Sequence, residues 1–154
     1  MQNLWFGDSH LCGHHHVPEI FYRIVRERED LDKFHRPISE EAKSGKYMGK
    51  GLLKEIFEKE KKFRGQAAIF VIQAGSNNLR AKGDRKVTAE KLLDDYQLLK
   101  DHFTKNSKQH ALIVTSIIPD GNPELKHYFE IVNAGLKAMF NRHRDDEDLS
   151  LIHI

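Results

Sequence analysis

Two polar residues are the best candidates for chemistry, and each lies a few positions beyond an apolar run. Ser9 follows the run 4–6, and Asn77 follows the uninterrupted apolar run 67–72. A serine at the point where a strand turns into a helix can direct its hydroxyl into a cleft, while its backbone N–H faces a developing oxyanion. The side chain of Asn77 could donate a hydrogen bond to the same oxygen. Either feature alone is also typical of a turn or a helix cap, so the fold must decide whether they meet.

The apolar pattern alternates between short strand-like runs and segments with the period of a helix. The expected strands cover residues 4–6, 34–38, 67–72 and 111–118, and the expected helices cover residues 17–25, 52–63, 88–103 and 125–139. Strands alternating with helical crossovers predict an α/β fold, a three-layer α/β/α sandwich around a flavodoxin-like parallel sheet. Ligands of such sheets bind beyond the carboxyl ends of the strands, which is where Ser9 and Asn77 fall.

Two local signals refine this order. Pro37 disfavours a central place in the sheet for the strand at 34–38, because proline has no N–H to donate to a neighbouring strand. Thr88 is expected to be the N-cap of the helix over 88–103.

Length and composition indicate one globular domain. The chain has 154 residues, of which 39% are hydrophobic and 31% charged. No apolar run approaches the roughly 20 residues of a membrane-spanning helix, and the N-terminus lacks the pattern of a signal peptide. We therefore expect a soluble protein without a membrane partner, cytoplasmic by default, although these patterns leave its location unknown. Cys12 is the only cysteine, which excludes an intrachain disulfide, and a net charge of +2 does not indicate a nucleic-acid partner.

The two polar clusters, in this order, resemble the SGNH/GDSL hydrolase superfamily. The run Gly7-Asp8-Ser9-His10 resembles its first sequence block, and Gly75-Ser76-Asn77-Asn78 resembles its third, with Asn78 in place of the usual aspartate. Gly45 is our candidate for the glycine of the second block, and Gly49 is the alternative. The resemblance covers about residues 4–140, in which Asn133 matches an asparagine often found on the helix that follows the third block.

The resemblance implies an esterase or acyl hydrolase acting on a small-molecule ester, without a cofactor or a metal. Ser9 would attack the ester carbonyl, and the oxyanion would be held by the backbone N–H groups of Ser9 and Gly45 together with the Asn77 side chain. The residues expected to support this site are Asp8, His10, Gly75 and Asn78.

The sequence departs from the family at the last block, an Asp-x-x-His that supplies the catalytic aspartate and histidine. The one Asp-x-x-His of the chain lies at 32–35, ahead of the third block, where a solvated loop is expected. We therefore expect an incomplete single domain over 1–148 that lacks the last strand and helix. Without a base, the barrier to attack by Ser9 would rise by roughly 5–8 kcal/mol, so the chain as given should be nearly inactive.

The last six residues have a separate interpretation. Residues 149–154 form an apolar run that directly follows a highly charged segment and does not continue the strand and helix pattern before it. They match one reading frame of a transposase-adaptor sequence. We expect them to be a non-native tail.

Three alternatives stay open. An SGNH-like domain without its base could bind an acyl or carbohydrate ligand, and an unrelated flavodoxin-like domain could hold phosphate in its strand-end loops. His10 and His14 would share one face of a helix starting near Ser9 and could bind a metal, although a polar loop that joins the first strand to its helix is expected. The basic stretch 43–64 is expected to be a solvated helix face, since glutamates interrupt it at ion-pair spacing.

Overall fold

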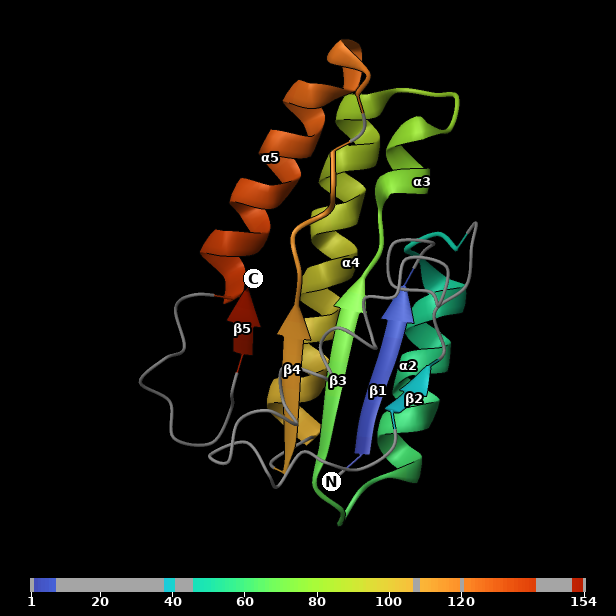
Figure 1. Ribbon diagram of the computed structural model, residues 1–154, viewed down its shortest axis with the longest axis vertical. Coiled ribbons are helices and arrows are strands. Elements are labelled where there is room, and N and C mark those ends of the chain that lie inside the picture. The colour runs from blue at the N-terminus through green and yellow to red at the C-terminus, as the bar shows by residue number, and fades with distance from the viewer. Residues whose placement is uncertain are drawn as a thin grey trace.

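A parallel five-stranded sheet organises the chain (Figure 1). The computed structural model describes residues 2–7, 38–40, 46–106, 109–119, 121–140 and 151–153, with the backbone alone described at 2–3, 38–40 and 151–153. The strand order is β2-β1-β3-β4-β5, and every neighbouring pair is parallel. The strands are β1 (Gln2–Gly7), β2 (Ile38–Glu40), β3 (Ala68–Gln73), β4 (His110–Val114) and β5 (Leu151–His153). The predicted parallel α/β sheet is confirmed.

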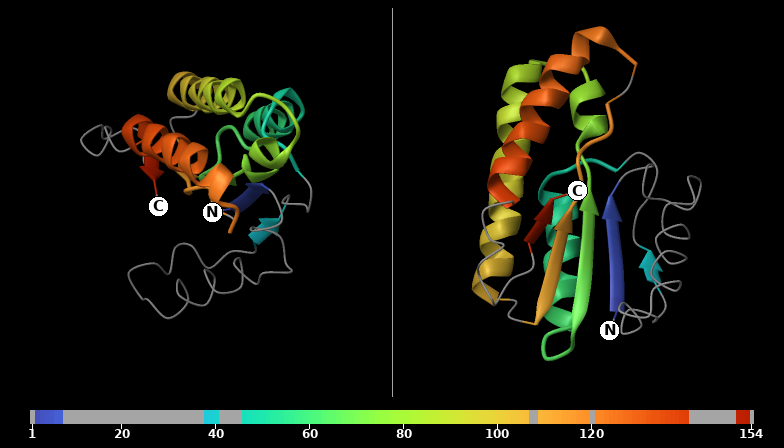
Figure 2. Two further views of the ribbon diagram at one scale, coloured as in Figure 1. Left: turned by 90° about the horizontal axis from the view of Figure 1, so that it is seen from above. Right: turned by 60° about the vertical axis from the view of Figure 1, so that its left-hand side comes forward.

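Four helices belong to the described part of the chain: α2 (Lys50–Lys62), α3 (Ser76–Arg80), α4 (Arg85–Asn106) and α5 (Pro123–Phe140). Helices α2 and α4 lie on one face of the sheet, and α5 packs beside α4 (Figure 2). The helix expected over 17–25 lies outside the described residues. No helix in the described ranges is both long enough and apolar enough to span a membrane.

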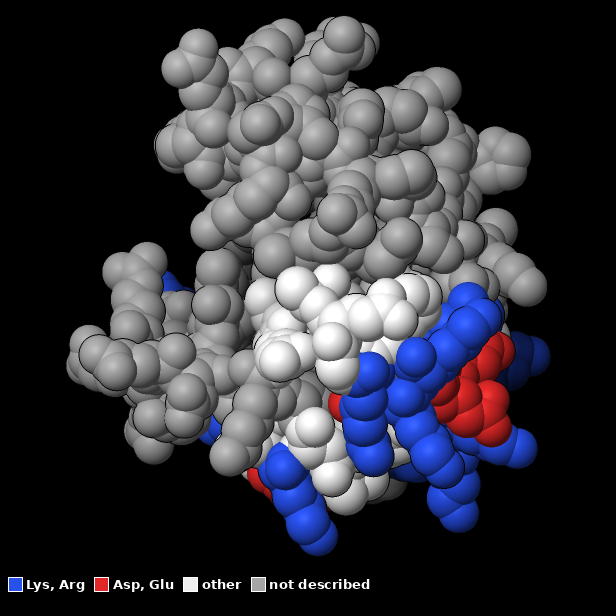
Figure 3. All heavy atoms as spheres, turned by 90° about the horizontal axis from the view of Figure 1, so that it is seen from below, with Lys and Arg blue, Asp and Glu red and all other residues white. Residues whose placement is uncertain are grey.

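Helix α2 has a basic outer surface, as its sequence predicts. Its last turn carries Lys59, Lys61 and Lys62, which suit the negative end of the helix dipole. Lys and Arg side chains gather over this end of α2, with acidic side chains next to them (Figure 3).

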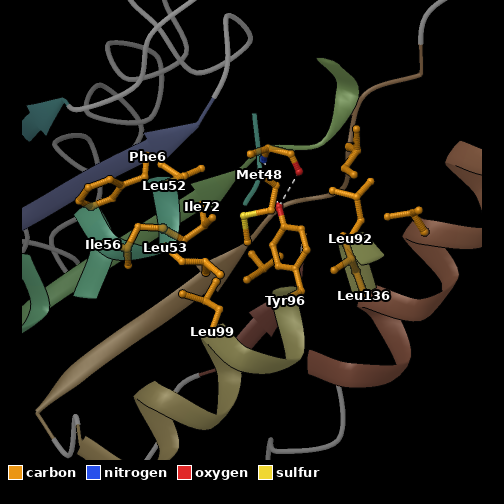
Figure 4. Packing of buried hydrophobic residues seen from close by; sticks show 14 of the residues in the cluster. Phe6, Met48, Leu52, Leu53, Ile56, Ile72, Leu92, Tyr96, Leu99 and Leu136 are labelled. Atoms are coloured by element: carbon orange, nitrogen blue, oxygen red, sulfur yellow. Dashed lines mark hydrogen bonds between the residues drawn. The ribbon is translucent and has the colours of Figure 1, made fainter. Parts of the chain in front are cut away.

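The hydrophobic core fills the space between the sheet and the helices (Figure 4). All six residues of β3 are buried, which explains the uninterrupted apolar run: β3 lies at the centre of the sheet and is covered on both faces. Alternate positions of the strands point into this core, where Phe6, Phe70 and Ile72 are fully buried. They pack in one cluster with helical residues such as Ile56 and Leu99.

The ends of several elements differ from the prediction. Thr88 is not the N-cap of α4: the helix begins at Arg85, and the Asp84 carboxylate accepts hydrogen bonds from the backbone N–H groups of Lys86 (2.9 Å) and Val87 (3.2 Å). The hydroxyl of Thr88 instead donates to the Asp84 carbonyl at 2.9 Å. Of the strand predicted over 34–38, only Ile38 is among the described residues, and it begins β2. Strand β2 lies at the edge of the sheet, as Pro37 indicates.

The sheet extends one strand beyond β4. The backbone of β5 pairs with β4 in parallel register, with Leu151 opposite Leu112 and His153 opposite Val114. These residues belong to the segment 149–154 that the sequence pattern predicts to be a non-native tail. They form the outermost strand next to β4, which the same pattern predicts to be the last strand of the chain. A strand there satisfies backbone N–H and C=O groups of β4 that would otherwise be unpaired.

A close helix crossing offers a test of this packing. A Cβ atom added at Gly135 on α5 would lie 2.5 Å from Leu93 Cδ2 on α4, whereas one added at Gly51 on α2 would meet nothing within 4 Å. We expect Gly135→Leu to lower the free energy of unfolding by about 1–3 kcal/mol through overpacking. The matched change Gly51→Leu should raise it by up to about 1 kcal/mol, because leucine favours helix more than glycine does. Urea unfolding of both variants checks this; equal effects would contradict the α4–α5 contact.

Candidate active site

The carboxyl ends of β1, β3 and β4 lie side by side. Gly7, the last residue of β1, is paired with Gln73, the last residue of β3. Just beyond β4, the backbone N–H of Thr115 donates to the carbonyl of Ile72 at 3.1 Å. The segments that leave these strands therefore start from the same end of the sheet, at the carboxyl ends of its strands. This end is called the site edge below. Four of the predicted site residues lie outside the described residues: Asp8, Ser9, His10 and Gly45.

The exit of β3 is a tight turn that requires glycine. Gly75 has a φ of 135°, and a Cβ atom there would lie 2.6 Å from Ile117 Cδ1. One residue earlier, the buried Tyr96 hydroxyl on α4 donates to the Ala74 carbonyl (2.8 Å) and accepts from the Ala74 N–H (3.1 Å). Figure 4 marks hydrogen bonding at the Tyr96 hydroxyl with a dashed line. The prediction missed this contact, because the spacing of Tyr96 in the sequence indicates only a buried face of a helix.

Asn77 links the third block to the segment that leads into α2. Its side-chain nitrogen Nδ2 donates to the backbone carbonyl of Lys46 at 2.8 Å. Lys46 follows Gly45 directly in the sequence. The structure thus brings the predicted oxyanion-hole asparagine to the residue next to the predicted second-block glycine.

Asn78 binds the same segment two residues further on. It accepts from the Met48 N–H at 2.9 Å and donates to the Met48 carbonyl at 2.8 Å. A carboxamide has both a donor and an acceptor and can match a peptide group in this way, whereas an ionised carboxylate has no hydrogen to give. The departure from the family pattern at Asn78 therefore suits the backbone that it contacts.

Two further side chains fix the loop after β4. Asn133 on α5 accepts from the Ile117 N–H (2.8 Å) and donates to the Ile117 carbonyl (2.9 Å). Gln73 donates from Nε2 to the Ser116 carbonyl at 2.9 Å. The ends of β3 and β4 are thereby joined by side chains as well as by the sheet. Beside them, Ser76 is buried, and its hydroxyl has no hydrogen-bond partner among the described residues.

Gly49, the alternative for the second-block glycine, has no steric need to be glycine. It precedes α2 with an extended backbone (φ 160°), and a Cβ atom there would meet nothing within 4 Å. Its carbonyl accepts the ordinary first helical hydrogen bond from Leu53 at 2.9 Å.

The best-connected histidines of the described chain lie at the other end of the sheet. His102 Nε2 is 3.0 Å from Glu60 Oε2, and His110 Nδ1 is 3.6 Å from Glu60 Oε1. His110 is the first residue of β4, so about 13 Å of strand separates it from the carboxyl end at Val114. This cluster cannot act on a group bound at the site edge. Within the described residues no three ligand-type side chains are grouped to hold a metal. The histidine pair His10 and His14 and the Asp-x-x-His run at 32–35 both lie outside the described residues.

Comparison with solved structures finds a similar fold in structures of an esterase, an acylhydrolase and a lipase. No protein-family model matches the sequence, and no curated protein matches it. The psychrotrophic esterase EstA from Pseudoalteromonas sp., inhibited by monoethylphosphonate, superposes with a TM-score of 0.57 at 14% identity over 99% of this chain and 75% of its own. A candidate acylhydrolase from Bacteroides fragilis has a TM-score of 0.55 at 15% identity, over 99% of this chain and 66% of its own.

A GDSL-like lipase from Bacteroides thetaiotaomicron is similar as well, with a TM-score of 0.50 at 12% identity over 99% of this chain and 67% of its own. The chain thus spans about two thirds of the length of the acylhydrolase and the lipase. At these identities the likeness concerns the fold, and the chain has an SGNH/GDSL hydrolase-type fold.

The pairing of Asn78 with Met48 predicts that the amide matters. Asn78→Asp should lower the free energy of unfolding by about 1–3 kcal/mol near neutral pH, because the Met48 carbonyl loses its donor. Acidification should shrink this deficit, since a protonated carboxyl regains a hydrogen to donate. The same change at Asn106, whose exposed amide donates to the His102 carbonyl at 3.1 Å, is the control, with a smaller expected effect of up to about 1 kcal/mol from the added charge at the carboxyl end of α4. Urea titrations at two pH values measure both; a deficit that does not depend on pH would contradict the pairing.

Proposed function

We propose that this chain is the greater part of a serine ester hydrolase in which Ser9 is the nucleophile. The oxyanion would be held by the backbone N–H groups of Ser9 and Gly45 and by the Asn77 side chain. One observation carries the proposal: the hydrogen bond from Asn77 Nδ2 to the Lys46 carbonyl, at the sheet edge where β1 ends. It ties two of the three proposed oxyanion-hole segments together.

Covalent geometry supports the third segment. Two peptide units separate Gly7 from Ser9, so their Cα atoms lie at most about 7.6 Å apart. Gly7 is itself paired with Gln73, which is four residues before Asn77. The strand that leads to Ser9 therefore ends within reach of the segment that carries Asn77.

The hydrogen bonding of Asn77 leaves it capable of the proposed role. A carboxamide nitrogen carries two hydrogens, and Lys46 is the acceptor for one of them among the described residues. The second hydrogen can be given to a ligand oxygen. A single preorganised donor of this kind is worth about 10²–10³ in rate.

We further propose that these 154 residues turn esters over slowly by themselves. Serine is a weak nucleophile unless a nearby base takes its proton. The sequence has no Asp-x-x-His after the third block, and His102 and His110 are occupied with Glu60 at the opposite end of β4. An added base should therefore raise the reactivity of Ser9.

A phosphonate with a good leaving group tests the proposal. Prolonged incubation should give a covalent adduct that peptide mass spectrometry maps to Ser9, and added imidazole should speed its formation by supplying a base. Asn77→Ala should slow labelling by about 10²–10³, because the phosphonyl oxygen loses a donor. Asn106→Ala, which removes an exposed amide on α4, is the control and should label at the normal rate.

Three results would count against Ser9 as the nucleophile. They are labelling that is unchanged in Ser9→Ala, an adduct on another residue, and no adduct even with imidazole present. A slow Asn77→Ala variant must also show an unchanged far-UV circular dichroism spectrum, since loss of the bond to Lys46 could otherwise act through the fold.

A further inference from the structure

A groove between α2 and α4 is separate from the strand ends. It has a volume of about 460 Å³, and its apolar floor includes Leu53, Phe57 and Leu98. Leu98 is 55% exposed and presents apolar surface to this groove. The Phe57 ring is stacked on His102 with ring centroids 4.0 Å apart, and His102 is held in turn by Glu60. The groove therefore has a fixed apolar floor that is open to solvent.

Cations stand at both ends of this groove. Lys50 and Lys61 both line it and are eleven residues apart on α2, which corresponds to about 16 Å along one helix face. No described residue forms an ion pair with either. Between them, Lys54 is 3.9 Å from Glu58, so those two charges offset each other.

The remaining cation of the lining is engaged. Arg64 donates to the buried Glu60 from Nη2 at 3.0 Å and from Nε at 3.2 Å, and this hydrogen bonding raises the pKa of Arg64. The charge that a ligand would meet thus comes mainly from Lys50 and Lys61.

We propose that this groove binds an amphipathic helix of a partner protein, with acidic residues at both ends of an apolar stripe. Apolar residues three and four apart would cover Phe57 and Leu98, as in other helix-in-groove complexes. Carboxylates about eleven residues apart would pair with Lys50 and Lys61. A fatty acid has one carboxylate and would neutralise one end only, and a second copy of α2 would bring the same lysines together.

Labelled peptides test the groove independently of ester hydrolysis. Three helical peptides would share one leucine stripe and carry Glu, Gln or Lys at the two flanking positions. Fluorescence anisotropy with the full chain should show the Glu peptide binding most tightly and the Lys peptide least, with the Glu complex weakened by salt. Replacing Lys50 and Lys61 by Glu together should weaken the Glu peptide roughly tenfold or more.

Two further variants separate charge from apolar contact. Leu98→Gln removes exposed apolar surface while keeping a good helix former, and it should weaken all three peptides by a similar factor. Lys126→Glu reverses an exposed charge on α5 and should change nothing. Equal affinity of the Glu and Lys peptides, or binding that ignores the change at Lys50 and Lys61, would overturn the proposal.

The competing occupants give distinct results. If dodecanoate displaces the Glu peptide and itself responds fully to Lys61→Glu alone, a fatty carboxylate is the better ligand and the proposal is wrong. If sedimentation shows a dimer that Leu98→Gln dissociates, the groove is a contact between copies and the proposal is wrong. A monomer that binds the Glu peptide and not dodecanoate supports it.

Discussion

Peptide groups outside the strands and helices lack regular backbone partners, and in this protein side chains from distant segments supply partners for three of them. Tyr96 binds the peptide of Ala74, Asn78 binds the peptide of Met48, and Asn133 binds the peptide of Ile117. Each uses one donor and one acceptor on a single residue. Because buried backbone groups are costly when unpaired, these three contacts fix the loops at one edge of the sheet.

The buried sheet and the polar edge depend on each other. Strand β3 is covered on both faces and is paired with β1 and β4, so its carboxyl end has little freedom to move. Gly75 turns the chain tightly against Ile117, and α3 then presents Asn77 to Lys46. A donor held in this way needs no rearrangement when charge develops on an oxygen, which is the condition for effective oxyanion stabilisation. The proposed chemistry would thus rest on rigidity that the apolar core provides.

Sequence patterns predicted the parts of this fold that depend on local periodicity. The apolar run 67–72 became the central strand, and Pro37 marked the edge strand. Long-range hydrogen bonds left no such signal: Tyr96 looked like any other residue of an apolar helix face, and the short helix α3 after Gly75 looked like a turn. Asp84 rather than Thr88 caps α4, because the helix begins one turn earlier than predicted and the Asp84 carboxylate accepts from the N–H groups of Lys86 and Val87. Asn77 was predicted from the family resemblance, and its contact with Lys46 could be seen only in three dimensions.

The central claim is that Asn77 and Ser9 serve one oxygen atom, and a crystal structure of the phosphonate adduct would test it most directly. In that crystal structure we expect the phosphonyl oxygen on Ser9 to lie about 3 Å from Asn77 Nδ2, while Nδ2 still donates to the Lys46 carbonyl. An adduct beyond hydrogen-bond distance of Asn77, or other protein groups accepting both of the Asn77 hydrogens, would show that the two residues do not share an oxygen.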